Sequence, residues 1–294
     1  MTTTEIIRQG QNGNATIVLY DDGTRIIDYD GELDIEYPLN VDLRVSGRCR
    51  FGLDERTKKS VCDFCHESAT TNGPRGNLDA LFDKLQALPR TTEVAIGINE
   101  ITPELIFFLE NMKEAGFVVN GTINQGLIQT GEHVALQGLF YGTGISYRSR
   151  KWNIDDPIYR EPNTVMHVIA GIDDIEEVLW LAENVCTKIL VLGEKDFGFN
   201  SGRVNMQSDN HRAWYRGIQK LFKIATVSFD NLAIEQLNIR RFFRDDNWAV
   251  FFQGEHSIYI NAVTGKFQPS SRSLLAQDWN EVTLAEYFRT KIEN

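Results

Sequence analysis

The stretch NVDLRVSGRCRFGLDERTKKSVCDFCHE, residues 40–67, joins a predicted buried strand at residues 40–47 to three of the chain's four cysteines. Cys62 and Cys65 form a C-x-x-C step, so two sulfurs from one tight turn can reach the same metal centre. Cys49 can supply a third sulfur across the 12 intervening residues. Thiolates favour zinc or iron–sulfur clusters over hard cations. The segment therefore predicts a metal centre directly after a strand.

A fourth protein ligand is harder to find. Cys186 lies in LWLAENVCTKILVL, where apolar neighbours predict an inert thiol in the core. Three cysteines and one vacancy indicate an iron–sulfur cluster with one open iron. Two alternatives remain at this point: a Cys3His zinc site completed by His66, and attachment of c-type haem to C-x-x-C-H. Haem attachment is disfavoured because the first residues, MTTTEIIRQG, contain no apolar signal segment.

The following residues predict repeated βα units. A helix is expected over residues 76–88, a strand over TEVAIGIN, a second helix over IFFLENMKEAG and a third strand over residues 117–124. Parallel βα arrays place the carboxyl ends of all strands on one side, so loops that are distant in sequence meet at one site.

These motifs resemble the radical S-adenosylmethionine (radical SAM) family from about Val41 to the region of Asp230. The family's cluster motif is usually C-x3-C-x2-C with an aromatic residue before the last cysteine, a place that Phe64 holds here. The first gap is wider in this chain, and residues 52–60 are interpreted as an inserted hydrophilic loop. GINEITP, residues 97–103, resembles the family's GGE segment in its G-x-N-E-P-T form.

The resemblance implies a set of binding residues. Cys49, Cys62 and Cys65 would hold a 4Fe-4S cluster, and Glu100 would receive the amino group of SAM. TVMHVIAGIDDIEEV resembles the family's G-x-I-x-G-x-x-E strand, which packs beside the adenine, although its first glycine is absent. The further SAM-binding residues implied are Gly97, Asn99, Ser146, Arg148, Val168, Gly171 and Ile172.

The resemblance also implies an activity. The reduced cluster would cleave SAM to methionine and a 5′-deoxyadenosyl radical, which would abstract hydrogen from an unidentified substrate. A small molecule is favoured over a peptide side chain, and a reductase, flavodoxin or ferredoxin would supply the electron. The sequence does not identify a catalytic side chain.

Composition narrows these expectations. The 294-residue chain is 42% hydrophobic, enough for a sizeable core, and its four cysteines are too few for a second cluster beside the first. A net charge of −11 makes nucleic acid an unlikely partner, because such binding relies on Lys and Arg. Cysteines kept for metal, with no apolar run long enough to cross a bilayer, predict a cytoplasmic protein that does not engage a membrane.

The expected fold class is α/β. A partial (βα)6 radical SAM barrel is predicted for residues 40–245, after an N-terminal β-hairpin extension over residues 1–39 with a turn at Asp22-Gly23. Residues 246–294 are expected to form a C-terminal β-hairpin, turning at Thr264-Gly265, and a helix. This last segment is a candidate substrate lid.

Overall fold

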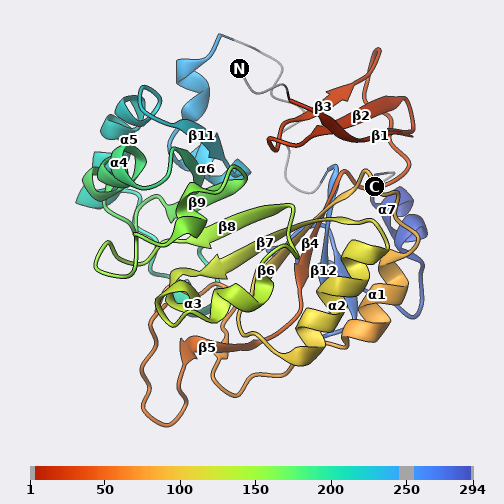
Figure 1. Ribbon diagram of the computed structural model, residues 1–294, viewed down its shortest axis with the longest axis horizontal. Coiled ribbons are helices and arrows are strands. Elements are labelled where there is room, and N and C mark those ends of the chain that lie inside the picture. The colour runs from red at the N-terminus through yellow and green to blue at the C-terminus, as the bar shows by residue number, and fades with distance from the viewer. Residues whose placement is uncertain (1–3, 245–254, 293–294) are drawn as a thin grey trace.

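The computed structural model describes residues 4–244 and 255–292, which form two β-sheets with surrounding helices (Figure 1). The smaller sheet is antiparallel and contains β1 (Ile6–Asn12), β2 (Ala15–Tyr20) and β3 (Arg25–Asp28). The predicted turn at Asp22-Gly23 joins β2 to β3, with Gly23 at φ +92°. The expected N-terminal hairpin is thus present, and β1 adds a strand that the sequence analysis did not include.

The larger sheet has ten strands in the order β11-β10-β9-β8-β7-β6-β4-β12-β13-β14. Every pair from β11 to β12 is parallel, and the last two pairs are antiparallel. The predicted α/β class is therefore confirmed. The parallel strands are β4 (Asn40–Arg44), β6 (Glu93–Ile98), β7 (Val118–Asn124), β8 (Gly142–Ser146), β9 (Thr164–Ile169), β10 (Lys188–Leu192), β11 (Thr226–Phe229) and β12 (Ser257–Asn261); β13 (Lys266–Gln268) and β14 (Gln277–Asp278) complete the sheet.

Helices connect many of these strands and begin at side chains that cap their free N–H groups. Thr102 caps α2, where Pro103 occupies the first turn, and Asp230 caps α6. The helices are α1 (Leu78–Leu85), α2 (Pro103–Glu114), α3 (Gln125–Gln129), α4 (Ile175–Asn184), α5 (Asp209–Leu221), α6 (Asn231–Gln236) and α7 (Leu284–Ile292), with 3-10 turns at Glu132–Leu136, Pro157–Arg160, Gly198–Asn200 and Ile239–Phe242. Within the described residues, none of these helices has the length and apolar character needed to span a membrane.

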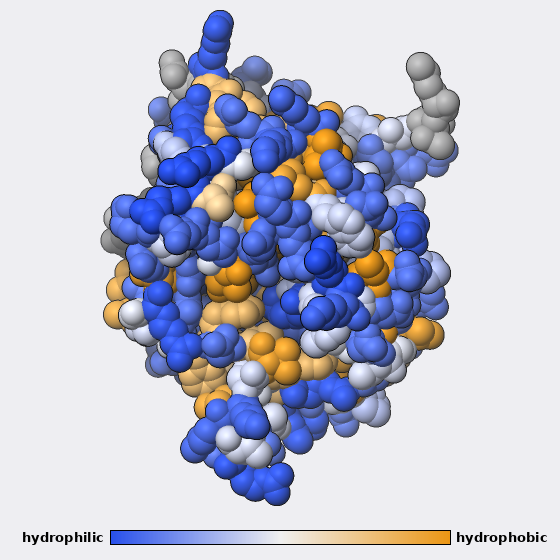
Figure 2. Space-filling view, turned by 90° about the vertical axis from the view of Figure 1, so that its left-hand side faces the viewer, coloured by the Kyte–Doolittle hydropathy of each residue, from blue (hydrophilic) through white to orange (hydrophobic). Residues whose placement is uncertain are grey.

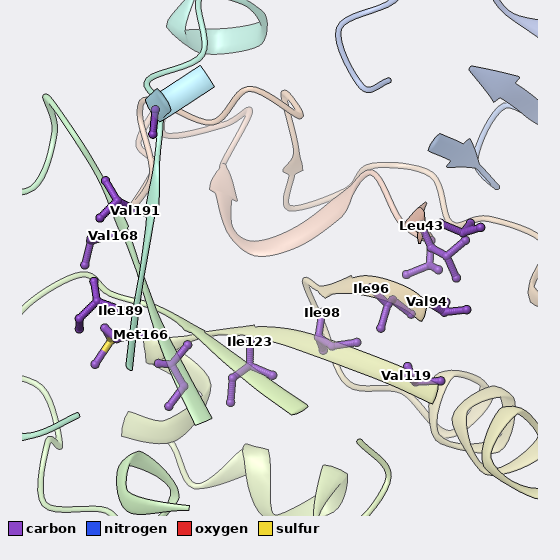
Figure 3. Close-up of a cluster of buried hydrophobic side chains, with 14 of the residues drawn as sticks. Leu43, Val94, Ile96, Ile98, Val119, Ile123, Met166, Val168, Ile189 and Val191 are labelled. Atoms are coloured by element: carbon purple, nitrogen blue, oxygen red, sulfur yellow. The ribbon is translucent and has the colours of Figure 1, made fainter. Parts of the chain in front are cut away.

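The main core lies between the sheet and the helices. Apolar side chains from successive parallel strands form a continuous layer, including Val94 and Ile96 of β6, Ile123 of β7 and Val191 of β10 (Figure 3). α1 packs against α2, and α4 packs against α5. Seen from the side of α4 and α5, the outer surface is mostly hydrophilic (Figure 2).

The opposite face of the parallel strands is unusually polar. Parallel strands are normally apolar on both faces because both are covered, whereas in β6 the buried Ile96 and Ile98 flank an exposed Gly97. Because side chains alternate along a strand and register fixes their neighbours, this polar face can be followed across the sheet. It carries Asp42, Gly97, Thr122, Asn124, Ser146 and His167. A polar face on a parallel sheet is suited to a bound ligand.

The C-terminal segment joins the main sheet. β12 pairs in parallel with β4, so that Tyr259 lies beside Asp42 and Asn261 beside Arg44. The predicted turn at Thr264-Gly265 joins β12 to β13, which pair in antiparallel fashion. The beginning of the expected C-terminal unit, residues 246–254, lies outside the described residues. β12 therefore continues the sheet that carries the polar face, and the parallel array extends beyond the predicted residue 245.

Candidate functional site

The wide gap in the cysteine motif is closed by a local hairpin. β5 (Arg48–Leu53) contains Cys49, and the chain returns along it, with the Val61 N–H donating to the Phe51 carbonyl at 3.1 Å. At the tip, the backbone of Asp54 pairs with the backbone of Lys59 in an antiparallel β-bridge. The Asp54 carboxylate accepts hydrogen bonds from two backbone N–H groups of the turn. The insertion is thus folded on itself and carries Cys62 back towards Cys49.

The three thiols of the motif lie close enough to affect one another. Burial raises the pKa of Cys49 to about 11, and the nearby groups of Cys62 and Cys65 raise it as well. Burial also raises the pKa of Cys65. Among the described residues, no group of three or more His, Cys, Asp or Glu side chains is arranged to hold a metal ion. All three thiols are free, and Cys49 lies close enough to Cys62 and Cys65 for their charges to influence it.

Two polar residues at strand ends contact the cysteine loop. Asn124, the last residue of β7, directs its Nδ2 to the Cys62 sulfur at 3.7 Å. The Arg148 guanidinium carbon lies 5.0 Å from the centre of the Phe64 ring, between the two cysteines of the C-x-x-C step. Arg148 Nε is buried and has no hydrogen-bond partner within the part of the chain that the structure describes. A buried donor without a partner beside this loop indicates room for an acceptor.

The loop that follows β10 packs directly on the cysteine loop. Its Phe199 N–H donates to the Cys65 carbonyl at 3.0 Å, and Arg203 donates to the Asp63 carbonyl at 3.0 Å. Gly198 has φ +65°, and a Cβ there would lie 2.1 Å from the His66 carbonyl oxygen. Glycine is required at this point because the two backbones touch. Gly198 thus permits the close contact with the cysteine loop.

Glu100 is linked to the same region through arginines. Its carboxylate accepts two hydrogen bonds from Arg75, at 2.6 and 2.9 Å, and Oε2 lies 3.7 Å from Nε of Arg48, the residue before Cys49. Asn99 donates to the Ser46 carbonyl. Glu100 and Asn99 line a cavity of about 560 Å³ at the start of α1 and α2. None of the three cysteines lines this cavity.

The expected adenine-binding turn after β9 is held by a buried polar cluster. His211 of α5 lies over Gly171, and its Nε2 is 2.8 Å from a Glu194 carboxylate oxygen. Both side chains are buried. Val168 is fully buried in the core, so only its backbone can reach a ligand on the polar face, whereas Gly171 and Ile172 are partly exposed.

The polar face contains titratable residues that the sequence analysis did not select. His167 is adjacent in register to Ser146, and burial, aided by the charge of Arg148, lowers the pKa of His167 to about 4. Although Asp42 is exposed, desolvation by the surrounding protein raises its pKa, and the charge of Lys195 only partly opposes this rise. A Cβ on Gly97 would meet no atom within 4 Å. Gly97 therefore faces open space on the polar face.

His167 could have been selected, because it occupies the first glycine position of the G-x-I-x-G pattern. Asp42 could also have been found, as a charged residue inside a predicted buried strand. Cys186 is buried as predicted, with its sulfur 3.4 Å from the Lys188 carbonyl oxygen. Asp230 caps α6 by accepting the Ala233 N–H.

A second cavity, of about 620 Å³, begins immediately after Cys65. His66 and Glu67 line it together with Tyr259 of β12 and Arg44 of β4. The Glu67 carboxylate is 2.8 Å from Arg44 Nε and accepts a hydrogen bond from the Tyr259 hydroxyl at 3.0 Å. Burial opposes ionisation of Glu67, but its contacts with His66, Arg44 and Tyr259 hold the pKa well below its usual range. We refer to this space as the His66 cavity.

No protein-family model matches the chain, and comparisons with curated proteins and with solved structures also give no match. The interpretation of the site therefore depends on the residues and contacts described above.

Proposed function

We propose that this protein is a single-cluster radical SAM enzyme whose parallel strands form a partial (βα)6 barrel. The observation that supports it best is that Cys49, Cys62 and Cys65 lie near one another, with Cys62 in contact with Asn124 at the carboxyl end of the parallel strand β7. Such strand ends are where ligands bind in α/β folds. The motif that resembles the family's cluster loop is thus next to the polar face.

The residue types fit a cluster held by three sulfurs, because three cysteines are the ligands that such a cluster takes. Cluster binding would release the thiol protons, because thiolates are the metal ligands. His66 Nε2 already lies 3.4 Å from both Lys195 Nζ and a Glu67 oxygen, so this nitrogen faces other partners. The hydrogen bond from Asn124 to Cys62 would influence the reduction potential of the cluster.

Two features fit SAM. Arg148 Nε is an unsatisfied donor beside the cysteine loop and suits the SAM carboxylate. The two hydrogen bonds from Arg75 occupy two acceptor sites of the Glu100 carboxylate. A carboxylate has about four such sites, so others remain. Glu100 can therefore accept the SAM amino group while Arg75 holds it in place. Ser146, beside Asn124 in register, is the proposed ribose contact.

When bound, the reduced cluster would supply reductive cleavage of SAM to methionine and a 5′-deoxyadenosyl radical that removes a hydrogen atom from the substrate. The chain's own part is to bind and orient the reactants and to exclude water. The proposed substrate is a small molecule, the electron donor a reductase, flavodoxin or ferredoxin, and the compartment the cytoplasm.

The test begins with anaerobic purification and iron–sulfide reconstitution. We expect a brown protein with about four iron atoms per chain, and release of 5′-deoxyadenosine when SAM and a strong reductant are added. Cys65→Ala should lose the iron and the product. Cys186→Ala is the matched control, because it removes a core thiol outside the motif, and it should retain both.

Retention of a full cluster by Cys65→Ala would contradict the proposal. So would reconstituted protein that keeps only tetrahedral zinc, which is the result expected for the Cys3His alternative. Production of 5′-deoxyadenosine from a small-molecule extract, but not from peptides, would support the proposed substrate class.

A further inference from the structure

A cavity lies on the helix-covered face of the sheet, where the helical cover is short. The connection from β7 to β8 contains α3, of 5 residues, and the 3-10 turn Glu132–Leu136, whereas α2 before β7 has 12 residues. Ile123 of β7 and Thr143 of β8 line a cavity of about 290 Å³ beside this turn. Sheet register places both side chains on the face opposite the polar one. We refer to this space as the His133 cavity.

A buried histidine lines this cavity and has one ring nitrogen to spare. The His133 side chain is 8% exposed, and its Nε2 lies 3.4 Å from an Asp156 carboxylate oxygen. Its Nδ1 is buried and has no hydrogen-bond partner within residues 4–244 and 255–292. Buried polar atoms normally have partners, because an unpaired one costs free energy. The Nδ1 atom of His133 is therefore able to take a hydrogen bond from a ligand.

Asp156 decides which kind of hydrogen bond Nδ1 makes. A carboxylate only accepts hydrogen bonds, so it favours the ring form that carries its proton on Nε2, and in that form Nδ1 is an acceptor. Asp156 is itself held in place, because its Oδ1 accepts the Ile158 N–H at 3.1 Å at the start of the turn Pro157–Arg160. A ligand at Nδ1 should therefore be a hydrogen-bond donor.

The rest of the lining combines apolar and acidic side chains. The apolar ones are Ile123, Val134, Leu136, Phe140, Pro157 and Ile158. The charged ones, Asp156 and Glu161, are both negative and disfavour an anion. Lys113 is also near, with its Nζ donating to the carbonyl oxygen of the lining residue Gly138 at 2.9 Å. A neutral hydroxyl enters a largely apolar space at less cost than a charged ammonium group.

We propose that the His133 cavity binds a small neutral molecule with an apolar body and a hydroxyl group, a phenol or a short alcohol, and that His133 Nδ1 accepts the hydroxyl hydrogen bond. The volume of about 290 Å³ is at the lower end for small-molecule sites. Val134 lines the cavity and is 56% exposed, so the cavity is reached from the surface. The sheet separates this site from the polar face, and it does not depend on the proposed function.

The test compares phenol with toluene, which has nearly the same shape but cannot donate a hydrogen bond. Each is titrated into the full chain without iron, and binding is measured as a saturable rise of the thermal unfolding midpoint. We expect phenol to bind about tenfold more tightly than toluene, because toluene leaves Nδ1 unpaired. In protein labelled with ¹⁵N in its five histidines, phenol should shift the ring-nitrogen NMR signals of His133, assigned through its backbone neighbours.

Three variants identify the residues responsible. His133→Leu removes the acceptor and should lower the affinity for phenol about tenfold, to that for toluene. His256→Leu is the matched control, because His256 also has a buried Nδ1 without a partner in the described part of the chain but does not line this cavity; it should bind like the wild type. Val134→Asp changes a mostly exposed side chain and should weaken both ligands by placing a charge in the apolar wall.

No saturable rise with phenol, or equal affinity for phenol and toluene, would overturn the inference. Unchanged preference for phenol in His133→Leu would do the same. Should His133→Leu not fold, the NMR signals and Val134→Asp decide: shifts at a histidine other than His133, or wild-type affinity in Val134→Asp, place phenol elsewhere and refute the site. Iron content of reconstituted protein tests the proposed enzyme separately.

Discussion

Asp173→Asn is predicted to stabilise the protein in a pH-dependent manner. Asp173 follows the Gly171 turn, and its Oδ2 accepts the Ile169 N–H at 2.6 Å. Burial raises the pKa of Asp173 from 3.8 to about 6, although the Ile169 hydrogen bond and the charge of Arg148 oppose the shift. Between these two values the folded state binds more protons than the unfolded state, so stability falls as pH rises from 3.8 to 6 and stays reduced above.

The magnitude follows from the two pKa values. One pKa unit corresponds to about 1.4 kcal/mol, so ionisation of Asp173 costs about 3 kcal/mol of unfolding free energy at pH 7.5 and about 1 kcal/mol at pH 4.5. Because the Asp173 side chain is partly exposed, both of these free energies are upper limits. Asparagine keeps an oxygen for the Ile169 N–H and has no proton to lose. The variant should therefore gain about 2 kcal/mol more at pH 7.5 than at pH 4.5.

Urea denaturation of wild type and variant at both pH values measures this difference. Asp174→Asn is the control, because Asp174 is exposed and caps α4, a role that asparagine fills equally well. It should change stability little at either pH. A gain for Asp173→Asn that is the same at both pH values, or a loss at pH 7.5, would refute the reasoning.

Gly171→Ala should lower the free energy of unfolding, measured by urea denaturation, by at least about 2 kcal/mol, because φ is +95° and a Cβ would lie 2.1 Å from the His211 ring. The control Gly31→Ala, at φ +76° with no atom within 4 Å, should lower it by only about 1 kcal/mol. Glu194→Ala should cost about 3–5 kcal/mol by leaving buried His211 without its carboxylate; an unchanged denaturation midpoint would argue against a structural pair. Glu100→Gln should keep the cluster but weaken SAM binding about 10- to 150-fold by equilibrium titration, because a charge-assisted hydrogen bond of about 1.5–3 kcal/mol is lost. Equal SAM affinity would show that residues 97–103 have another role.

Local signals in the sequence predicted most of the repeated βα order. Apolar alternation identified β4, β6 and β7, and the glycine turns identified the hairpins around Gly23 and Gly265. These features depend on neighbouring residues, so periodicity and turn chemistry are sufficient to find them. The pairing of β12 with β4 joins residues more than two hundred positions apart, and nothing local in either strand specifies such a partner.

The residues of the candidate site also divide into those that the sequence identifies and those that only the structure brings together. The sequence by itself determined the three cysteines, the strand before them and the GINE segment, because spacing within one loop limits which sulfurs can act together. Only the tertiary structure decided that the insertion folds into a hairpin, that Arg148 stacks on Phe64 and that Lys195 reaches His66. These contacts join separate strand ends, and their positions follow from sheet register and chain return, which no short pattern of residues encodes.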